Sequence, residues 1–151
     1  MFKPRVIVGL LGIDQHEVGA VAVAALLRDA GMEVIYAGRY NTPGSLLQMA
    51  ADEDADVIGI SCHSWEYLEY MPGLMESIRA RHLDVHVVLG GSVITEGDAR
   101  LMSALGVSGI FGPASSSEQI VTNIRALAAA RQQRARLGPV PEEPRPPKET
   151  E

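Results

Sequence analysis

The sequence is short of cysteine, aromatic residues and basic charge, and each shortage argues against a class of protein. Cys62 is the one cysteine in 151 residues, so no intrachain disulfide can form, which fits a reducing compartment. The formal net charge is −6, aromatics make up 5% of residues and no basic patch occurs, which argues against a nucleic-acid partner. No apolar run is long enough to span a bilayer and no secretory signal precedes the first run, so we expect a cytoplasmic protein without membrane contacts.

Short apolar runs alternate along the chain with longer amphipathic segments. The runs predict strands at residues 6–10, 33–36, 57–60, 85–89 and 109–111. Helical spacing of apolar residues predicts helices at about 17–30, 43–50, 66–81, 96–105 and from 117 onward. Five strand-then-helix units indicate an α/β fold with a doubly wound, five-stranded parallel sheet, either flavodoxin-like or Rossmann-like.

The composition changes near residue 131. The first part of the chain is apolar enough to bury a core, whereas the last part is rich in proline and charge with almost nothing apolar. Such a segment buries too little apolar surface to offset the entropy that it would lose on ordering. We therefore expect one domain at residues 1–130 and a disordered tail at residues 131–151.

The loop after the first predicted strand carries an acidic residue and a histidine. Ligands of doubly wound sheets bind at the carboxyl ends of the strands, where this loop lies. The Asp14 carboxylate, two residues from the His16 imidazole, can accept its Nδ1–H and leave Nε2 as a lone-pair donor. Such a pair suits a metal ligand or a general base. The alternative is an aspartate that caps the helix beside a solvated histidine. Gly19, in the first helical turn, leaves room for a bulky ligand.

Three more loops at this edge carry candidate contacts. Ser61 follows the third strand, where its hydroxyl would bond a ligand or cap the next helix, and His63 is either a second ligand or base or an exposed loop residue. Gly90 and Gly91 permit a close backbone approach to a flat ligand or a tight turn. Gly112 and Ser115 precede a helix N-terminus, which suits an anion or a cap. The phosphate-loop and dinucleotide-binding glycine motifs are absent, so those interpretations lose their main support.

Taken together, these loops resemble the cobalamin-binding domains of adenosylcobalamin-dependent acyl-CoA mutases, the methylmalonyl-CoA mutase family, including those whose small subunit is a separate chain. The resemblance covers about residues 4–130. Three motifs occur in order at the expected loops: Asp14-x-His16-x-x-Gly19 for Asp-x-His-x-x-Gly, Ser61 for the serine of Ser-x-Leu, and Gly90-Gly91 for the Gly-Gly pair.

The resemblance implies a role for the first motif in binding the cofactor adenosylcobalamin (cobalamin). His16 would be the lower axial ligand of the cobalt, in place of the cofactor's own dimethylbenzimidazole base. Asp14 would hydrogen-bond His16 and tune its donor strength, and Gly19 would make room for the corrin. Two residues depart from the family here, since Gln15 replaces a usual glycine and Val18 a usual arginine.

The displaced nucleotide tail would enter a slot between the sheet and a helix. Ser61 would bond its base, Gly90 and Gly91 would line the slot, and Gly112 and Ser115 would lie near the tail. His63 stands where the family leucine is expected, so a polar ring would lie close to the base.

The resemblance further implies the small subunit of a heteromeric mutase, an isomerase that rearranges a carbon skeleton by a radical reaction. The chain has no room for the acyl-CoA-binding barrel, so the active enzyme would need a large barrel-type subunit as partner, with a mutase-associated GTPase as a possible chaperone. No catalytic residue is expected in this chain, because the cofactor carries the chemistry. The alternatives are a non-catalytic cobalamin-binding carrier or sensor, and a flavodoxin-like domain with another ligand or none.

Overall fold

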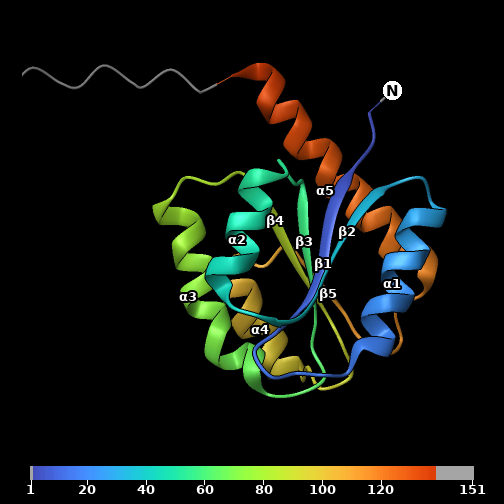
Figure 1. The fold of residues 1–151 in the computed structure, drawn as a ribbon, viewed down its shortest axis with the longest axis vertical. Helices are drawn as coiled ribbons and strands as arrows, with labels where there is room; N and C mark the ends of the chain where they lie inside the picture. The colour runs from blue at the N-terminus through green and yellow to red at the C-terminus, as the bar shows by residue number, and fades with distance from the viewer. Residues whose placement is uncertain (1, 139–151) are drawn as a thin grey trace, which may run out of the picture.

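A computed structural model describes residues 2–138 of the chain (Figure 1). Strands and helices alternate within this range, and none of these helices is both long and apolar enough to cross a membrane. In chain order the elements are β1 (Arg5–Leu11), α1 (Glu17–Asp29), β2 (Glu33–Asn41), α2 (Pro43–Asp52), β3 (Val57–Ser61), α3 (Glu66–Ala80), β4 (His86–Gly90), α4 (Glu96–Ala104), β5 (Gly109–Phe111) and α5 (Ser117–Leu137).

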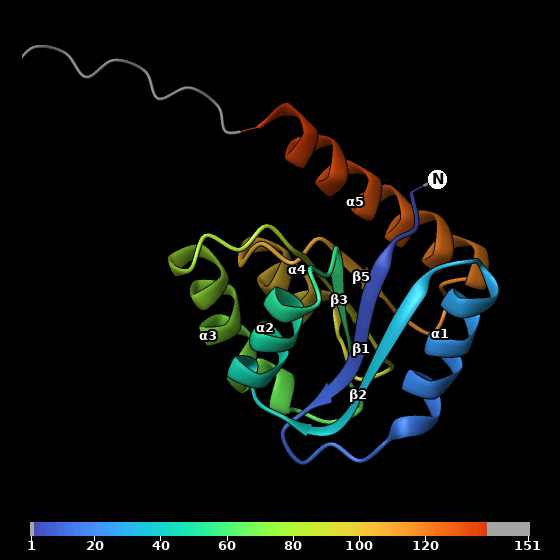
Figure 2. The same ribbon diagram turned by 45° about the horizontal axis from the view of Figure 1, so that its top comes forward.

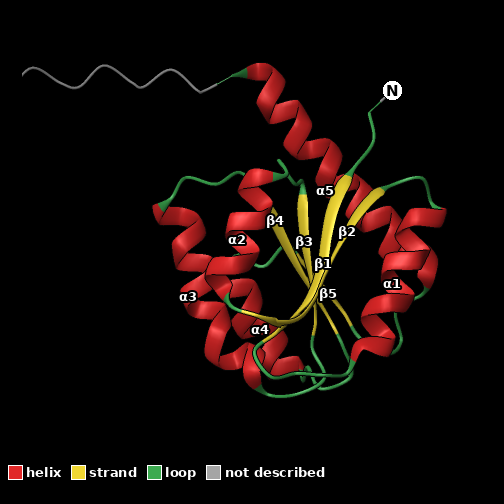
Figure 3. Ribbon diagram, viewed as in Figure 1, coloured by secondary structure: helices red, strands yellow, loops and turns green. Residues whose placement is uncertain are grey.

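The strands form one parallel sheet in the order β2-β1-β3-β4-β5 (Figure 3). This order is the flavodoxin-like one, which decides between the two arrangements that the sequence allowed. The direction of winding reverses between β1 and β3. The loops after these two strands therefore flank the switch point, where ligands of such sheets bind.

Helices cover both faces of the sheet and create two apolar layers. Helices α1 and α5 lie on one face, and α2, α3 and α4 lie on the other (Figure 2). Strand β1 supplies both layers, because its side chains alternate between Ile7 and Leu11 on the α2–α3 side and Val6, Val8 and Leu10 on the α1–α5 side. A strand buried on both faces is apolar throughout, which explains the continuous apolar runs in the sequence.

Strand β2 extends to Asn41, beyond the end at residue 36 that the apolar run predicted. The extension is irregular, with register shifts against β1 and positive φ angles at Gly38 and Tyr40. The Asn41 side-chain amide stabilises it by donating to the carbonyl oxygens of Leu10, Ala37 and Gly38. Apolar periodicity missed this segment because side-chain hydrogen bonds hold it in place.

Helix α5 extends to Leu137, past the domain boundary expected at residue 130, so the prediction of a disordered tail is wrong for residues 131–137. The Arg131 side chain is only 14% exposed and pairs with Asp56 at 2.9 Å and Asp54 at 2.6 Å. The charge that suggested a solvated segment is therefore paired with the loop before β3. The rest of the predicted tail, residues 139–151, lies outside the described residues.

Candidate functional site

The Asp14–His16 pair lies in the loop between β1 and α1, beside the switch point of the sheet. The Asp14 carboxylate is buried, and its Oδ1 atom lies 2.8 Å from His16 Nδ1 and 3.1 Å from the His16 backbone nitrogen. Burial raises the pKa of Asp14, but hydrogen bonds from His63 and His16 outweigh it and hold the pKa below its ordinary value. An ionised carboxylate only accepts hydrogen bonds, so Nδ1 of His16 carries the hydrogen, and in the neutral ring Nε2 has the lone pair.

The imidazole of His16 is open to solvent. Its side chain is 67% exposed, and within residues 2–138 no side chain or backbone group hydrogen-bonds its Nε2. The same residues contain no cluster of three or more His, Cys, Asp or Glu side chains that could hold a metal ion. His16 therefore offers a single nitrogen, which suits a metal that brings most of its ligands with it.

Asp14 also links two loops that are far apart in the sequence. Its second oxygen, Oδ2, accepts a hydrogen bond of 2.9 Å from the backbone N–H of His63, in the loop after β3. One carboxylate thus serves both histidines, whose ring centroids lie 5.8 Å apart. The spacing of two residues between Asp14 and His16 is visible in the sequence, but the contact with His63 is not.

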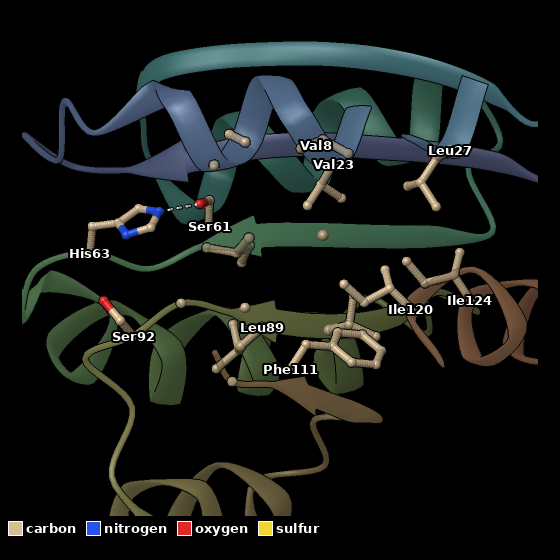
Figure 4. A pocket seen from close by; sticks show the side chains of 18 of the residues that line it. Val8, Val23, Leu27, Ser61, His63, Leu89, Ser92, Phe111, Ile120 and Ile124 are labelled. Carbon is tan, nitrogen blue, oxygen red and sulfur yellow. Dashed lines mark hydrogen bonds between the residues drawn. The ribbon is translucent and has the colours of Figure 1, made fainter. Parts of the chain in front are cut away.

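His63 contacts two more of the predicted site residues. Its Nε2 lies 2.9 Å from the hydroxyl oxygen of Ser61 (Figure 4). A β-carbon on Gly19, in the first turn of α1, would lie 3.0 Å from the same nitrogen. Gly19 therefore makes room for the His63 ring, in addition to the room for a ligand that we predicted.

A cavity of about 310 Å³ lies between the sheet and helices α1 and α5. It extends between the strand residues and the two helices, with Ser61, His63 and Ser92 towards one end and apolar side chains along the rest (Figure 4). Its apolar walls include Val8 and Val88 of the sheet, Val23 and Leu27 of α1, and Phe111, Ile120 and Ile124 of β5 and α5. We call this cavity the slot and its polar end the mouth.

The structure brings most of the predicted site residues to the slot. Gly19, Ser61, His63, Gly90, Gly91 and Gly112 line it. Asp14 and His16 do not line it, but the contacts with His63 hold them beside its mouth. Ser115 is not in its wall, and its backbone N–H donates to the Gly112 carbonyl in a turn before α5.

The sequence analysis missed Ser92 and the apolar walls. Ser92 directly follows the glycine pair, so a hydroxyl next to a flexible turn was an available signal. The wall residues of the strands and helices gave no such signal, because they have the same apolar spacing as core residues. The wall residues differ from core residues only because they border the cavity between the helices and the sheet, which the sequence does not show.

The glycine pair at the end of β4 has a structural role that its sequence did not reveal. Gly91 has φ +151°, and a β-carbon there would overlap the carbonyl oxygen of Cys62. The two loops are held together by a 2.7 Å hydrogen bond from the Cys62 N–H to the Gly90 carbonyl. Gly91 therefore allows the loops after β3 and β4 to pack backbone against backbone at the mouth.

The first turn of α1 is held by the edge strand of the sheet. His16 is the N-cap residue and makes no side-chain capping bond. Instead, Glu17 accepts a 2.7 Å hydrogen bond from the Tyr36 hydroxyl and pairs with Arg39 at 3.3 Å. Burial and the Glu17 carboxylate raise the pKa of Tyr36 to about 12, so its hydroxyl remains a donor at neutral pH. These contacts fix the start of the helix that follows His16.

Four large apolar side chains are exposed at the carboxyl edge of the sheet, the edge at which His16 lies. Ile13 is 74% exposed and Val18 87% exposed, on either side of His16 in the sequence. Tyr40, near the end of β2, and Trp65, the N-cap residue of α3, are more than half exposed. Exposed large apolar side chains at the edge where ligands of such sheets bind are candidates for contact with a ligand or a partner.

The fold and the site define a class: a flavodoxin-like ligand-binding domain with an apolar slot and a carboxylate–imidazole pair beside its mouth. A family model described as "B12 binding domain" matches residues 4–122. The pivalyl-CoA mutase small subunit of Xanthobacter autotrophicus is 44% identical over 124 residues, which cover 82% of each chain. The 2-hydroxyisobutanoyl-CoA mutase small subunit of Aquincola tertiaricarbonis is 36% identical over 127 residues, covering 84% of this chain and 93% of that subunit. The chain belongs to the B12-binding domain family, in the branch that contains the small subunits of acyl-CoA mutases.

More distant similarities include a longer mutase and solved structures with the same fold. The ethylmalonyl-CoA mutase of Cereibacter sphaeroides is 37% identical over 72% of this chain, which spans only 17% of that enzyme. A solved cobalamin-binding protein from Desulfitobacterium hafniense has a TM-score of 0.68 at 16% identity, over 83% of this chain and 59% of that one. The receiver domain of the response regulator NarL from Mycobacterium tuberculosis has a TM-score of 0.67 at 19% identity, over 85% and 98% of the two chains. At these identities the solved structures show the fold alone.

Proposed function

We propose that this chain binds adenosylcobalamin as the small subunit of a heteromeric acyl-CoA mutase, with His16 as the lower axial ligand of the cobalt. The observation that carries the proposal is the Asp14–His16 pair beside the mouth of an apolar slot. Family membership supports cobalamin as the cofactor. The similarity to small subunits of two acyl-CoA mutases supports the role in an isomerase.

The chemistry of His16 fits the proposed ligand. Its Nε2 faces away from Asp14 and belongs to an exposed ring, while the carboxylate holds Nδ1 on the other side of that ring. A corrin supplies four nitrogen atoms to its cobalt, so one protein nitrogen is sufficient. Asp14 is buried and held by three hydrogen bonds, so it fixes the tautomer and the direction of the His16 ring.

The slot fits the nucleotide tail that His16 would displace. Its volume of about 310 Å³ is in the usual range for a small-molecule pocket, and its walls are mainly apolar, as a flat aromatic base requires. Ser61 lies at the mouth, where it would donate a hydrogen bond to the base. Gly90, Gly91 and Gly112 line the same end, where the absence of side chains leaves space for the ribose and phosphate of the tail. Ser115, which is outside the wall, is a weaker candidate for contact with the tail.

When bound, the adenosyl form of the cofactor supplies a carbon-centred radical through cleavage of its cobalt–carbon bond. This chain's residues would hold and orient the cofactor. His16, held by Asp14, would bind its cobalt, and the slot would hold its tail. The exposed apolar residues Ile13, Val18, Tyr40 and Trp65 would exclude water around it when they are covered.

In this proposal, a large partner subunit binds the substrate. The match covers only 17% of the length of the ethylmalonyl-CoA mutase, so most of that enzyme lies outside the part that this chain matches. The exposed apolar residues at the carboxyl edge of the sheet support a partner that covers this edge. A GTPase chaperone and a cytoplasmic location remain predictions.

The test is to add adenosylcobalamin to the purified chain and to examine the coordination of its cobalt. We expect a base-off absorption spectrum, and histidine nitrogen coordination in the electron paramagnetic resonance spectrum of the reduced form. His16→Ala should abolish the nitrogen signal, whereas Asp14→Ala should weaken cofactor retention less. His82→Asn is the matched control, because His82 is exposed at the opposite edge and asparagine tolerates its positive φ of 52°.

Two results would overturn the proposal. One is the absence of cobalamin binding far above micromolar concentration, both alone and with a large mutase subunit present. The other is a nitrogen signal that persists in His16→Ala. Binding without any effect on the activity of a large subunit would instead favour the alternative of a cobalamin carrier or sensor.

A further inference from the structure

His63 is the site residue that the family pattern does not explain. It stands where the resemblance implies leucine, yet its ring lies at the mouth of the slot, with Nε2 2.9 Å from the Ser61 hydroxyl (Figure 4). A leucine at this position would pack against a ligand but would form no hydrogen bond. The substitution therefore adds a polar group beside the hydroxyl that is expected to contact the base.

Contacts to the backbone and to the ring of His63 hold this residue in place. Its backbone N–H donates to Asp14 Oδ2 at 2.9 Å, and its ring fills the space that the missing side chain of Gly19 leaves. An exposed loop histidine needs neither contact. The position of the ring relative to Ser61 is therefore set by residues that belong to the cofactor site itself.

The Ser61 hydroxyl has one hydrogen-bond partner among the described residues, the His63 ring. A hydroxyl that donates to the ring turns its hydrogen away from the slot. A hydroxyl that accepts from the ring keeps its hydrogen free for a ligand, and the bond that it accepts polarises it. The base that would enter the slot, once displaced from cobalt, has a free ring nitrogen that only accepts. Burying this nitrogen without a donor would be unfavourable.

We propose that His63 is a positioning residue for the cofactor's tail: its Nε2–H donates to Ser61 and directs the hydroxyl hydrogen into the slot, towards the acceptor nitrogen of a flat heterocyclic base. The inference rests on the proposed function and goes beyond it, because it assigns a recognition role to a residue that departs from the family pattern. It also gives a second reason for glycine at position 19, because a side chain there would contact the His63 ring.

The first test compares two corrinoids on the full chain, in the presence of the large subunit if binding requires it. Cobalamin has the nucleotide tail and cobinamide lacks it. We expect His63→Leu to weaken cobalamin binding by about fivefold, the scale of one neutral hydrogen bond, and to leave cobinamide binding unchanged. His63→Gln should retain the affinity, because its amide nitrogen reaches the same place as Nε2. Thermal unfolding of each variant checks that it folds.

The second test asks whether His63 acts through Ser61. In a double-mutant cycle with cobalamin, adding His63→Leu to Ser61→Ala should cause no further loss, because the hydroxyl is already absent. Nitrogen-15 NMR of the ligand-free chain provides an independent measurement of which ring nitrogen of His63 carries hydrogen. The His63→Gln spectrum assigns the signal.

Three results would overturn the inference while leaving the proposed function intact. They are equal loss of both corrinoids in His63→Leu, additive losses in the double-mutant cycle, and an Nε2 atom without hydrogen in the NMR spectrum. If the wild-type chain does not bind cobalamin even with the large subunit, the proposed function fails and the inference fails with it.

Discussion

Replacement of Gly91 by alanine tests whether the glycine pair at the end of β4 is required for folding as well as for a ligand. Gly91 has φ +151°, and an added β-carbon would overlap the carbonyl oxygen of Cys62. The obstacle is backbone, which cannot rotate away as a side chain can. The loops after β3 and β4 would have to separate, at the mouth of the slot.

The structure allows the effect to be divided into parts. The unfavourable φ destabilises the alanine variant by about 1 kcal/mol or more. The steric overlap adds about 1–3 kcal/mol, the usual range for overpacking. Separation of the loops would also break the hydrogen bond from the Cys62 N–H to the Gly90 carbonyl, which contributes about 1 kcal/mol. We therefore expect a loss of about 3–5 kcal/mol, a large fraction of the stability of about 5–15 kcal/mol that is usual for a domain.

Two other glycines separate these contributions. Gly31, after α1, has φ +88° and nothing within 4 Å of an added β-carbon, so Gly31→Ala introduces strain without overlap. Gly73 lies within α3, also with nothing nearby, so Gly73→Ala should stabilise the protein by about 0.5–1 kcal/mol through helix propensity. Urea unfolding followed by circular dichroism measures all three variants. If Gly91→Ala is no less stable than Gly31→Ala, the steric explanation is wrong.

The remaining predictions concern the buried ion pair and the buried thiol. Arg131→Met should lower the free energy of unfolding by about 2–3 kcal/mol, because it leaves the buried Asp56 carboxylate without its cation. Arg134→Met, which removes an ion pair to a half-exposed aspartate, should change it by less than about 1 kcal/mol, and equal effects in urea unfolding would contradict this reasoning. Burial raises the pKa of the Cys62 thiol to about 12, so almost no thiolate exists at pH 8. A thiol reagent should therefore label the native chain far more slowly than the urea-unfolded chain, and equal rates would show that the thiol is accessible.

The sequence predicted the parts of the fold that depend on local patterns. Apolar runs located the strands, and helical spacing placed the start of α2 at residue 43, where the structure has it. The predictions failed where distant polar contacts decide the structure. The end of β2 depends on the Asn41 amide, and the end of α5 depends on Arg131, which pairs with residues more than 70 positions away. A charged residue in the sequence gives no indication of whether its partner is water or a buried carboxylate.

The candidate site also contains contacts that the sequence could suggest and contacts that only the fold creates. The Asp14–His16 hydrogen bond joins residues two positions apart, so the sequence could suggest it. The bond from His63 to the same carboxylate joins residues 49 positions apart, and only the fold brings them together. The steric need for glycine at position 91 was equally hidden, because the Cys62 carbonyl that it avoids belongs to another loop.

The placement of the two ends of the described chain has a practical consequence. The N-terminal segment and the end of α5 both lie at the edge of the sheet opposite the loops that follow β1 and β3 (Figure 1). A fluorophore or a surface anchor attached near residue 2 or residue 138 would therefore stand clear of His16. Binding of a corrinoid or a large protein could then be followed on an immobilised chain whose ligand edge is entirely accessible.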